Sequence, residues 1–364
     1  MRSFMSHTSF DWSAYSSPVR IGPDPRYFGS SQDVKCLAAI AVRYGVPLDE
    51  SATRARQYHR LLVRAGGAMR SSGLALELDA MPRPRRFGRL LRAARIIHPF
   101  PTLLNVAATA ALACIADGGV PAPLTLATMM LVMLCAQSSI GVTNDIFDRD
   151  LDVRAKPWKP LVAGLVSMRS AVVLATGLAA ASIALAATLG LAGGALAVLG
   201  LGCGLAYDVR LKRTPWSAVP YMLGIPVLPL WVWAVAGDWR PVLWWLLPLG
   251  GLLGLALHLA NTLPDIEDDA SNGVRGLAHR LGSRASMLLA WASFALALAL
   301  SAAIAPFVVY DERIYVLALA FGVGSLAATV AMYAARRDRF ALQAGFALLG
   351  VGSAVLAAGW LAAL

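Results

Sequence analysis

Long apolar stretches, separated by short polar segments, dominate the chain after residue 96. A helix that crosses the hydrocarbon of a bilayer needs about 20 mostly apolar residues, because each residue adds about 1.5 Å. The pattern therefore predicts nine membrane-spanning helices, at residues 97–116, 121–144, 170–189, 192–207, 216–236, 241–264, 285–307, 314–335 and 340–364.

One uncharged stretch, from Ser170 to Tyr207, is too long for a single span. It contains Gly190, Gly193 and Gly194, and glycines favour a tight turn. We therefore expect two antiparallel helices that meet at these glycines.

The composition agrees with a lipid environment. Hydrophobic residues make up 58% of the chain, charged residues 15%, and the mean hydropathy is +0.62, which excludes an ordinary soluble domain. The net charge is +11, but the charges flank apolar runs, so we expect contact with membrane lipid and no nucleic-acid partner. Tryptophans lie near span ends, as at a membrane interface: Trp216, Trp239, Trp244 and Trp245.

Lysine and arginine gather in alternate loops, which predicts the orientation because cytoplasmic loops collect these residues. The basic loops carry Arg149, Arg154, Lys156, Lys159, Arg169, Arg210, Lys212, Arg213, Arg275, Arg280, Arg284, Arg336, Arg337 and Arg339. The opposite loops carry only Arg240 and Arg313. We expect an integral, multi-pass protein of a bacterial-type cell membrane, with a cytoplasmic N-terminus.

Residues 1–85 differ in composition from the rest, with Ser, Arg, Gly and Pro among short apolar pieces and no secretion signal at the start. We expect a poorly structured or small helical cytoplasmic extension there, of unknown function. Residues 86–364 are expected to form an all-α, polytopic membrane domain.

Three carboxylates mark the end of the second predicted span. At about 100° per residue, Asp148 lies about 60° and Asp152 about 20° from Asp145 around a helix, so the three form one stripe, with Asn144 at its edge. Asp150 points elsewhere.

The end of the sixth predicted span is similar. Asn261, Asp265 and Asp269 are four residues apart and form a second stripe, which Asp268 borders. Carboxylates so close to hydrocarbon call for a cation, and a set of oxygen ligands without His or Cys suits Mg²⁺. Because Mg²⁺ shares its ligand sphere with phosphate oxygens, two facing stripes predict a metal-bound diphosphate. The neighbouring basic loops are suited to neutralise an anionic leaving group.

The motifs resemble those of the UbiA superfamily of intramembrane prenyltransferases. Asn144-Asp145-x-x-Asp148-x-x-x-Asp152 matches the first acidic motif of that family, and Asp265-x-x-x-Asp269 matches the second. The segments that follow, 159–164 and 276–282, are also similar to family segments. The likeness covers about residues 90–364.

The resemblance implies a helical bundle around a central cavity and Mg²⁺-dependent transfer of an isoprenyl group from a prenyl diphosphate to an acceptor. By the same resemblance, one metal is held by Asp145, Asp148 and Asp152 and the other by Asp265 and Asp269. Substrate contacts are expected from Asn144, Lys159, Tyr207, Asn261 and one or both of Arg210 and Lys212.

The acceptor is less constrained. An aromatic acceptor of the hydroxybenzoate or quinone-precursor kind needs a base, for which Asp208 and Asp268 are candidates, and Arg95 is a candidate anchor for an acidic acceptor. His258 is expected to be a buried histidine with a backbone or hydroxyl partner.

Three alternatives stay open at this stage: an intramembrane terpene cyclase, transfer to a sugar, glycerol ether or tetrapyrrole, and a cation-coupled transporter. The motifs lie at one membrane face, which disfavours a midplane transport site. Oligomeric state and prenyl length are not predicted.

Overall fold

The structure is a computed structural model that describes residues 86–266, 274–308 and 311–364. Within these residues, helices are the only regular elements, and the described residues belong to one compact unit. The expectation of an extension at residues 1–85 lies outside the described residues, as do Asp268 and Asp269.

Nine helices of the described part are long and apolar enough to cross a membrane, so the chain is an integral, multi-pass membrane protein. They are α5 (Pro99–Asp117), α6 (Pro123–Phe147), α8 (Met168–Ala187), α9 (Leu191–Val209), α10 (Val219–Ala236), α11 (Leu246–Thr262, with the short helices on either side), α14 (Ser283–Ile304), α15 (Glu312–Arg336) and α16 (Arg339–Ala362).

Short helices connect or extend these spans. They are α4 (Arg86–Ala93), η3 (Ala94–Ile97), α7 (Arg149–Ala155), η4 (Leu211–Arg213), η5 (Pro241–Trp245), η6 (Leu263–Asp265), α13 (Leu277–Leu281) and η7 (Ala305–Phe307).

The nine predicted spans and the all-helical class are confirmed, with boundaries that differ by a few residues. The uncharged stretch divides into α8 and α9 as expected, and the turn lies at Gly190, whose φ of +89° suits glycine. Gly193 and Gly194 instead belong to the first turn of α9. The four tryptophans at predicted span ends are exposed, in agreement with an interfacial position.

The helices pack mainly against their neighbours in sequence, and contacts between α16 and α5 bring the last span to the first. One core cluster gathers Trp231 and Trp233 of α10 with Leu246 of α11, Met129 of α6 and Trp360 of α16. A second core cluster joins α11, α14 and α16. The buried apolar side chains between the helices therefore come from both halves of the chain.

The helices α10 and α11 approach each other closely because two glycines of α11 face α10. A Cβ atom on Gly250 would lie 2.7 Å from Cβ of Pro226, and one on Gly254 would overlap the backbone carbonyl oxygen of Tyr221. Small residues that let backbones approach are typical of packing in membranes. This contact fixes Tyr221 and its neighbours relative to the end of α11.

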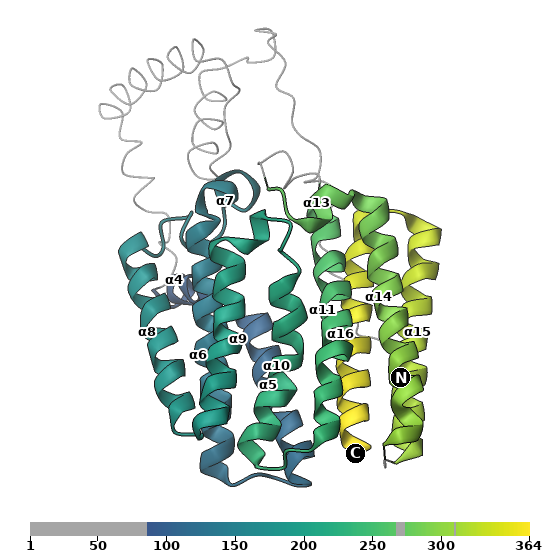
Figure 1. Ribbon diagram of the computed structural model, residues 1–364. Coiled ribbons are helices and arrows are strands. Elements are labelled where there is room, and N and C mark those ends of the chain that lie inside the picture. The colour runs from purple at the N-terminus through teal and green to yellow at the C-terminus, as the bar shows by residue number, and fades with distance from the viewer. Residues whose placement is uncertain (1–85, 267–273, 309–310) are drawn as a thin grey trace, which may run out of the picture. The chain divides into compact units, whose positions relative to one another are not determined.

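The C-terminal ends of α6, α9 and α11 lie at the same end of the bundle. Figure 1 shows the short helices α7 and α13 at that end, above α6 and α11 respectively. Asp265, after α11, pairs there with Arg339 at the start of α16. The polar residues predicted from the sequence therefore share one end of the fold.

Candidate active site

The first acidic motif does not continue as one straight helix. The helix α6 ends at Phe147, and Asp148, with φ −96° and ψ 1°, separates it from α7. The i→i−4 hydrogen bonds nevertheless continue across this residue, from the N–H of Asp148 to Asn144 at 2.9 Å and from the N–H of Asp152 to Asp148 at 2.8 Å. The single stripe of carboxylates stays a prediction. Asp150 is exposed, as expected.

Lys159 joins two of the motif's carboxylates. Its Nζ atom lies 2.7 Å from Oδ1 of Asp145 and 2.6 Å from Oδ2 of Asp152. Burial works to lower the pKa of Lys159, but its hydrogen bonds to the two carboxylates raise that pKa above its usual value. Burial raises the pKa of Asp152, and Lys159 offsets this only in part. Asp145, Asp152 and Lys159 thus form a first acidic cluster, in which Lys159 is charged.

Asp148 belongs to a second cluster, with residues from the end of α9. Nδ2 of Asn144 donates to Oδ2 of Asp148 at 3.0 Å and to Oδ1 of Asp208 at 2.9 Å. Nζ of Lys212 lies 2.7 Å from Oδ1 of Asp148 and 3.8 Å from Oδ1 of Asp208. Arg213 adds a more distant charge, 3.6 Å from Asp148. Asn144 therefore links the first motif to Asp208.

The structure distinguishes Arg210 from Lys212, one or both of which the sequence predicted to contact the substrate. The Lys212 side chain is only 10% exposed and contacts Asp148, whereas Arg210 ends α9 and is exposed. Lys212 thus occupies the position beside the carboxylates. Arg95, in η3, is also exposed.

The carboxylates fit a hydrated Mg²⁺ better than a metal cage formed by protein alone. Oδ2 of Asp145 and Oδ2 of Asp208 are buried without a hydrogen-bond partner in the described part of the chain, which suits an additional cation. Among those residues, no three His, Cys, Asp or Glu side chains converge on one metal position. Mg²⁺ needs only one or two carboxylates when water and phosphate complete its shell.

The second motif is described only in part. Asp265 lies at the end of η6 and forms an ion pair with Arg339. Asn261, one turn earlier, donates a hydrogen bond of 3.4 Å to the hydroxyl of Tyr221. The facing arrangement of the two motifs therefore stays a prediction.

Three rings form an aromatic cluster near the two motifs. The ring of Tyr221 lies 5.3 Å from that of Tyr207 and 5.1 Å from that of His258, measured between centroids. His258 is 2% exposed, and its Nε2 atom lies 3.0 Å from the hydroxyl oxygen of Ser217. The expectation of a buried histidine with a hydroxyl partner is confirmed.

Sequence reasoning missed three residues of this region. His98 contacts Asp145, Tyr221 contacts Asn261, and Ser217 contacts His258. His98 precedes Pro99 at the start of the first span, which is a visible signal, although it does not specify a contact. Neither of the other two stands in a motif, so only the fold identifies them.

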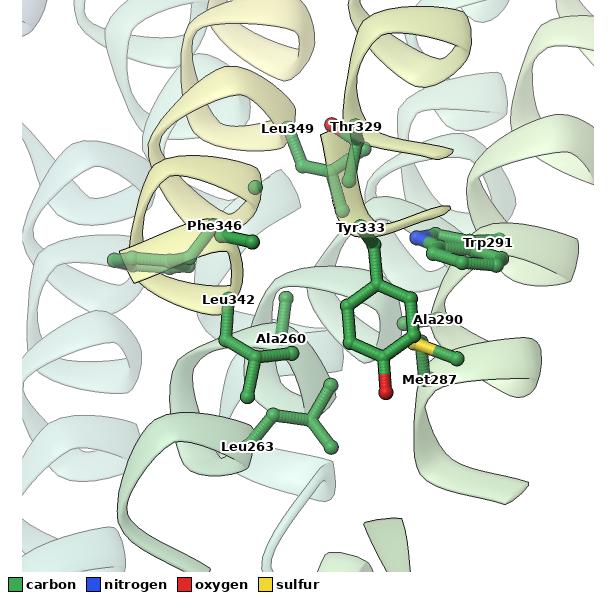
Figure 2. A pocket seen from close by; sticks show the side chains of 12 residues that line it. Ala260, Leu263, Met287, Ala290, Trp291, Thr329, Tyr333, Leu342, Phe346 and Leu349 are labelled. Carbon is green, nitrogen blue, oxygen red and sulfur yellow. The ribbon is translucent and has the colours of Figure 1, made fainter. Parts of the chain in front are cut away.

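A separate pocket lies between α11, α14, α15 and α16, and Figure 2 shows its lining. Trp291, Tyr333, Met287 and Phe346 surround it, and Leu263, the first residue of η6, also lines it. It encloses about 20 Å³, which is room for about one water molecule. This pocket is too small for an isoprenyl tail, and the central cavity stays a prediction.

Known proteins resemble this chain in sequence and in fold. The UbiA prenyltransferase family model matches residues 104–350. A digeranylgeranylglyceryl phosphate synthase of Natronomonas pharaonis is 30% identical over 176 residues, 48% of this chain and 63% of that protein. A 4-hydroxybenzoate octaprenyltransferase of Albidiferax ferrireducens is 32% identical over 219 residues, 58% of this chain and 68% of that protein.

Solved structures agree on the fold. A UbiA homolog from Archaeoglobus fulgidus, bound to GPP and Mg²⁺, aligns with a TM-score of 0.59 and 17% identity, covering 74% of this chain and 99% of that one. A UbiA homolog from Aeropyrum pernix aligns with a TM-score of 0.54 and 22% identity, over 69% of this chain and 96% of that one.

Proposed function

Because the chain belongs to the UbiA prenyltransferase family, we propose that it transfers an isoprenyl group from a prenyl diphosphate to an acceptor within the membrane, with Mg²⁺ as cofactor. The observation that carries the proposal is the pair of acidic clusters at the ends of α6 and α9, each joined by a lysine whose side chain is at most 15% exposed. Relatives named as prenyltransferases support the reaction class.

Asp145, Asp148 and Asp152 are proposed to hold one metal ion, and Asp265 with Asp269 a second. Bound Mg²⁺ supplies positive charge to the departing diphosphate. The unpartnered Oδ2 atom of Asp145 supports a cation at the first motif. A homolog bound to GPP and Mg²⁺ supports the same donor chemistry.

The chain's own cations bind the diphosphate in this proposal. Lys159 and Lys212 exchange part of their contact with carboxylates for phosphate oxygens, while Asn144 keeps Asp148 and Asp208 together. The carbon–oxygen bond breaks, its electron pair leaves with the diphosphate, and the acceptor attacks the allylic carbon. Tyr207, which precedes Asp208 in α9 and whose ring lies 5.3 Å from that of Tyr221, is proposed to line the prenyl site.

Water must be kept from the allylic carbon. Residues 156–167 follow the first motif and place Leu161, which is 6% exposed, in a core cluster with Val142 and Ala171. This loop is the proposed cover over the first cluster. Residues 274–282 are the corresponding proposed cover over the second motif.

We propose an aromatic acceptor of the hydroxybenzoate kind, and the 4-hydroxybenzoate octaprenyltransferase relative supports it. Asp208 is the proposed base for the acceptor proton because its Oδ2 atom is free of hydrogen bonds in the described residues. Asp268 is a second candidate, and Arg95 is the proposed anchor for an acidic group. A glycerol-ether acceptor is the main alternative, supported by the digeranylgeranylglyceryl phosphate synthase relative.

The site is proposed to face the cytoplasm of a bacterial-type cell membrane. Arg149, Lys159, Lys212 and Arg213 lie at the end of the bundle that carries the acidic clusters, and basic loops favour the cytoplasmic side. Reactivity of single cysteines introduced at exposed positions, such as Asp150 and Asp238, toward a membrane-impermeant reagent tests this orientation. Labelling of the Asp150 position from the outside of intact cells would contradict it.

Release of diphosphate tests the proposal directly. Purified protein in lipid discs is given geranyl, farnesyl or geranylgeranyl diphosphate, with Mg²⁺ or EDTA, and with 4-hydroxybenzoate, a glycerol-ether phosphate or no acceptor. Mg²⁺-dependent release that requires an acceptor is expected. Release without an acceptor and with a cyclic hydrocarbon product would favour a cyclase, and no release under any condition would reopen the transporter alternative.

A further inference from the structure

His98 occupies a strained position between η3 and α5. Its backbone has φ 51° and ψ 64°, in the left-handed region, and it is one of two residues other than glycine with positive φ in the described part of the chain. A residue other than glycine keeps such a conformation only when surrounding contacts impose it. The side-chain contacts of His98 are therefore candidates for what imposes this backbone conformation.

The imidazole of His98 reaches a carboxylate of the first motif. Nε2 lies 2.9 Å from Oδ1 of Asp145, a side chain that is 1% exposed. Because a carboxylate oxygen accepts hydrogen bonds, the Nε2–H group of His98 is the donor of this hydrogen bond. The same Oδ1 atom accepts from Lys159 at 2.7 Å, whereas Oδ2 has no partner among the described residues.

The neighbouring turn of α6 is shaped to admit this ring. A Cβ atom on Gly141, one turn before Asp145, would lie 3.1 Å from Cγ and 3.2 Å from Cδ2 of His98. That is closer than an ordinary van der Waals contact, so even a methyl group at 141 requires the ring to shift by a few tenths of an ångström. The backbone conformation of His98, the absence of a side chain at Gly141 and the position of Asp145 are thus all consistent with an imidazole ring held against the Asp145 carboxylate.

We propose that His98 is a positioning residue for Asp145: it holds Oδ1, so that Oδ2 would be left free to bind the metal ion. The role rests on the proposed function. Lys159 is shared between Asp145 and Asp152 and is proposed to contact phosphate when substrate binds. His98 contacts only the first of these carboxylates, and so keeps its orientation fixed while Lys159 changes partners.

Matched substitutions at 98 separate this role from simple packing. His98→Leu keeps a bulky side chain and removes the donor, while His98→Gln places an amide donor near the position of Nε2. Gly141→Ala displaces the ring without changing any polar group, and Gly202→Ala is its control, because a Cβ atom there meets nothing within 4 Å.

The readout is thermal unfolding with an unreactive prenyl thiodiphosphate, as a function of Mg²⁺ concentration. For His98→Leu and Gly141→Ala, the Mg²⁺ concentration that gives half the thermal shift is expected to rise about 10- to 100-fold. His98→Gln is expected to recover most of the wild-type value, and Gly202→Ala to match it. Activity measured in parallel should regain its rate when Mg²⁺ is raised.

The outcomes are distinguishable. A wild-type midpoint in His98→Leu, or a midpoint in His98→Gln as weak as in His98→Leu, would overturn the role of His98 and leave the proposed function intact. Absence of any Mg²⁺-dependent shift in the wild-type protein would overturn the proposed function, and the role of His98 with it.

Discussion

The hydroxyl of Ser217 lies 3.0 Å from Nε2 of His258, and the two side chains are 1% and 2% exposed. The same hydroxyl oxygen accepts the backbone N–H of Leu277 at 2.9 Å. Ser217 thus ties α11 to the segment after the second acidic motif. Gly276 packs closely against the same region. A Cβ atom on Gly276 would lie 2.7 Å from the carbonyl oxygen of Lys212 and 3.1 Å from the hydroxyl oxygen of Ser217.

Replacing Ser217 by alanine is expected to loosen residues 274–282. The change leaves Nε2 of His258 and the N–H of Leu277 without this partner, and each unpaired buried group costs about 1–3 kcal/mol. Hydrogen exchange at 274–282 should accelerate. Ser301→Ala is the control, because that buried hydroxyl donates to Tyr315 instead. Equal exchange at 274–282 in both variants would contradict the proposed role of Ser217 in holding this segment against α11.

Lys212 is expected to matter far more than Arg210. Lys212→Met removes a partly buried cation beside Asp148, and diphosphate release should fall at least about 100-fold. Arg210→Met removes an exposed charge of the same sign two residues earlier, and the rate should change little. Steady-state release assays on the two purified variants compare them. A larger loss for Arg210→Met would reverse the assignment.

Removal of Mg²⁺ by EDTA is expected to abolish diphosphate release, and added Mg²⁺ to restore it, because the proposed site neutralises the leaving group with a metal. Asp145→Ala and Asp265→Ala should abolish turnover even with excess Mg²⁺, while membrane insertion and the elution profile stay unchanged. Normal turnover in either well-folded variant would remove that residue from the site.

Gly254→Ala is expected to destabilise the fold. The added methyl group overlaps the backbone carbonyl of Tyr221, and overpacking of this kind typically costs about 1–3 kcal/mol. Gly251→Ala, one turn away in α11, is the matched control, since its Cβ atom would lie an ordinary 3.6 Å from the carbonyl oxygen of Met222. Thermal unfolding in one detergent gives both values. Equal midpoints would show that α10 can shift freely.

A chain that begins at residue 84 is expected to insert, fold and release diphosphate. The acidic clusters, their lysines and the core clusters of the described part all lie after that position. Membrane fractionation followed by the release assay measures both properties. A well-folded chain of this length without activity would show that residues 1–83 complete the site.

The spans were predictable because their signal is local. A run of apolar residues long enough to cross a bilayer has few alternatives to a helix, and Gly190 identified the turn within the longest run. The acidic motifs were visible for the same reason. The spacing of the motif did not, however, reveal the one-residue interruption at Asp148, nor its contact with Lys212.

The contacts of His98, Tyr221 and Ser217 were not predictable in this way. Each joins residues far apart in the sequence: His98 and Asp145 are separated by 47 positions, and Ser217 and Leu277 by 60. Neither helical periodicity nor motif spacing carries that information. The choice of Lys212 over Arg210 likewise required the direction in which the chain leaves α9, where φ of Arg210 is −144°.

The acidic clusters at the ends of α6 and α9 lie where the apolar spans give way to polar loops. A reaction proposed for that position divides its products between two solvents. The diphosphate is released directly into water, and the lengthened hydrocarbon remains dissolved in the bilayer, so neither product crosses a barrier. Supply of the donor then depends on diffusion within the plane of the membrane, and the lipid composition becomes a determinant of the turnover rate.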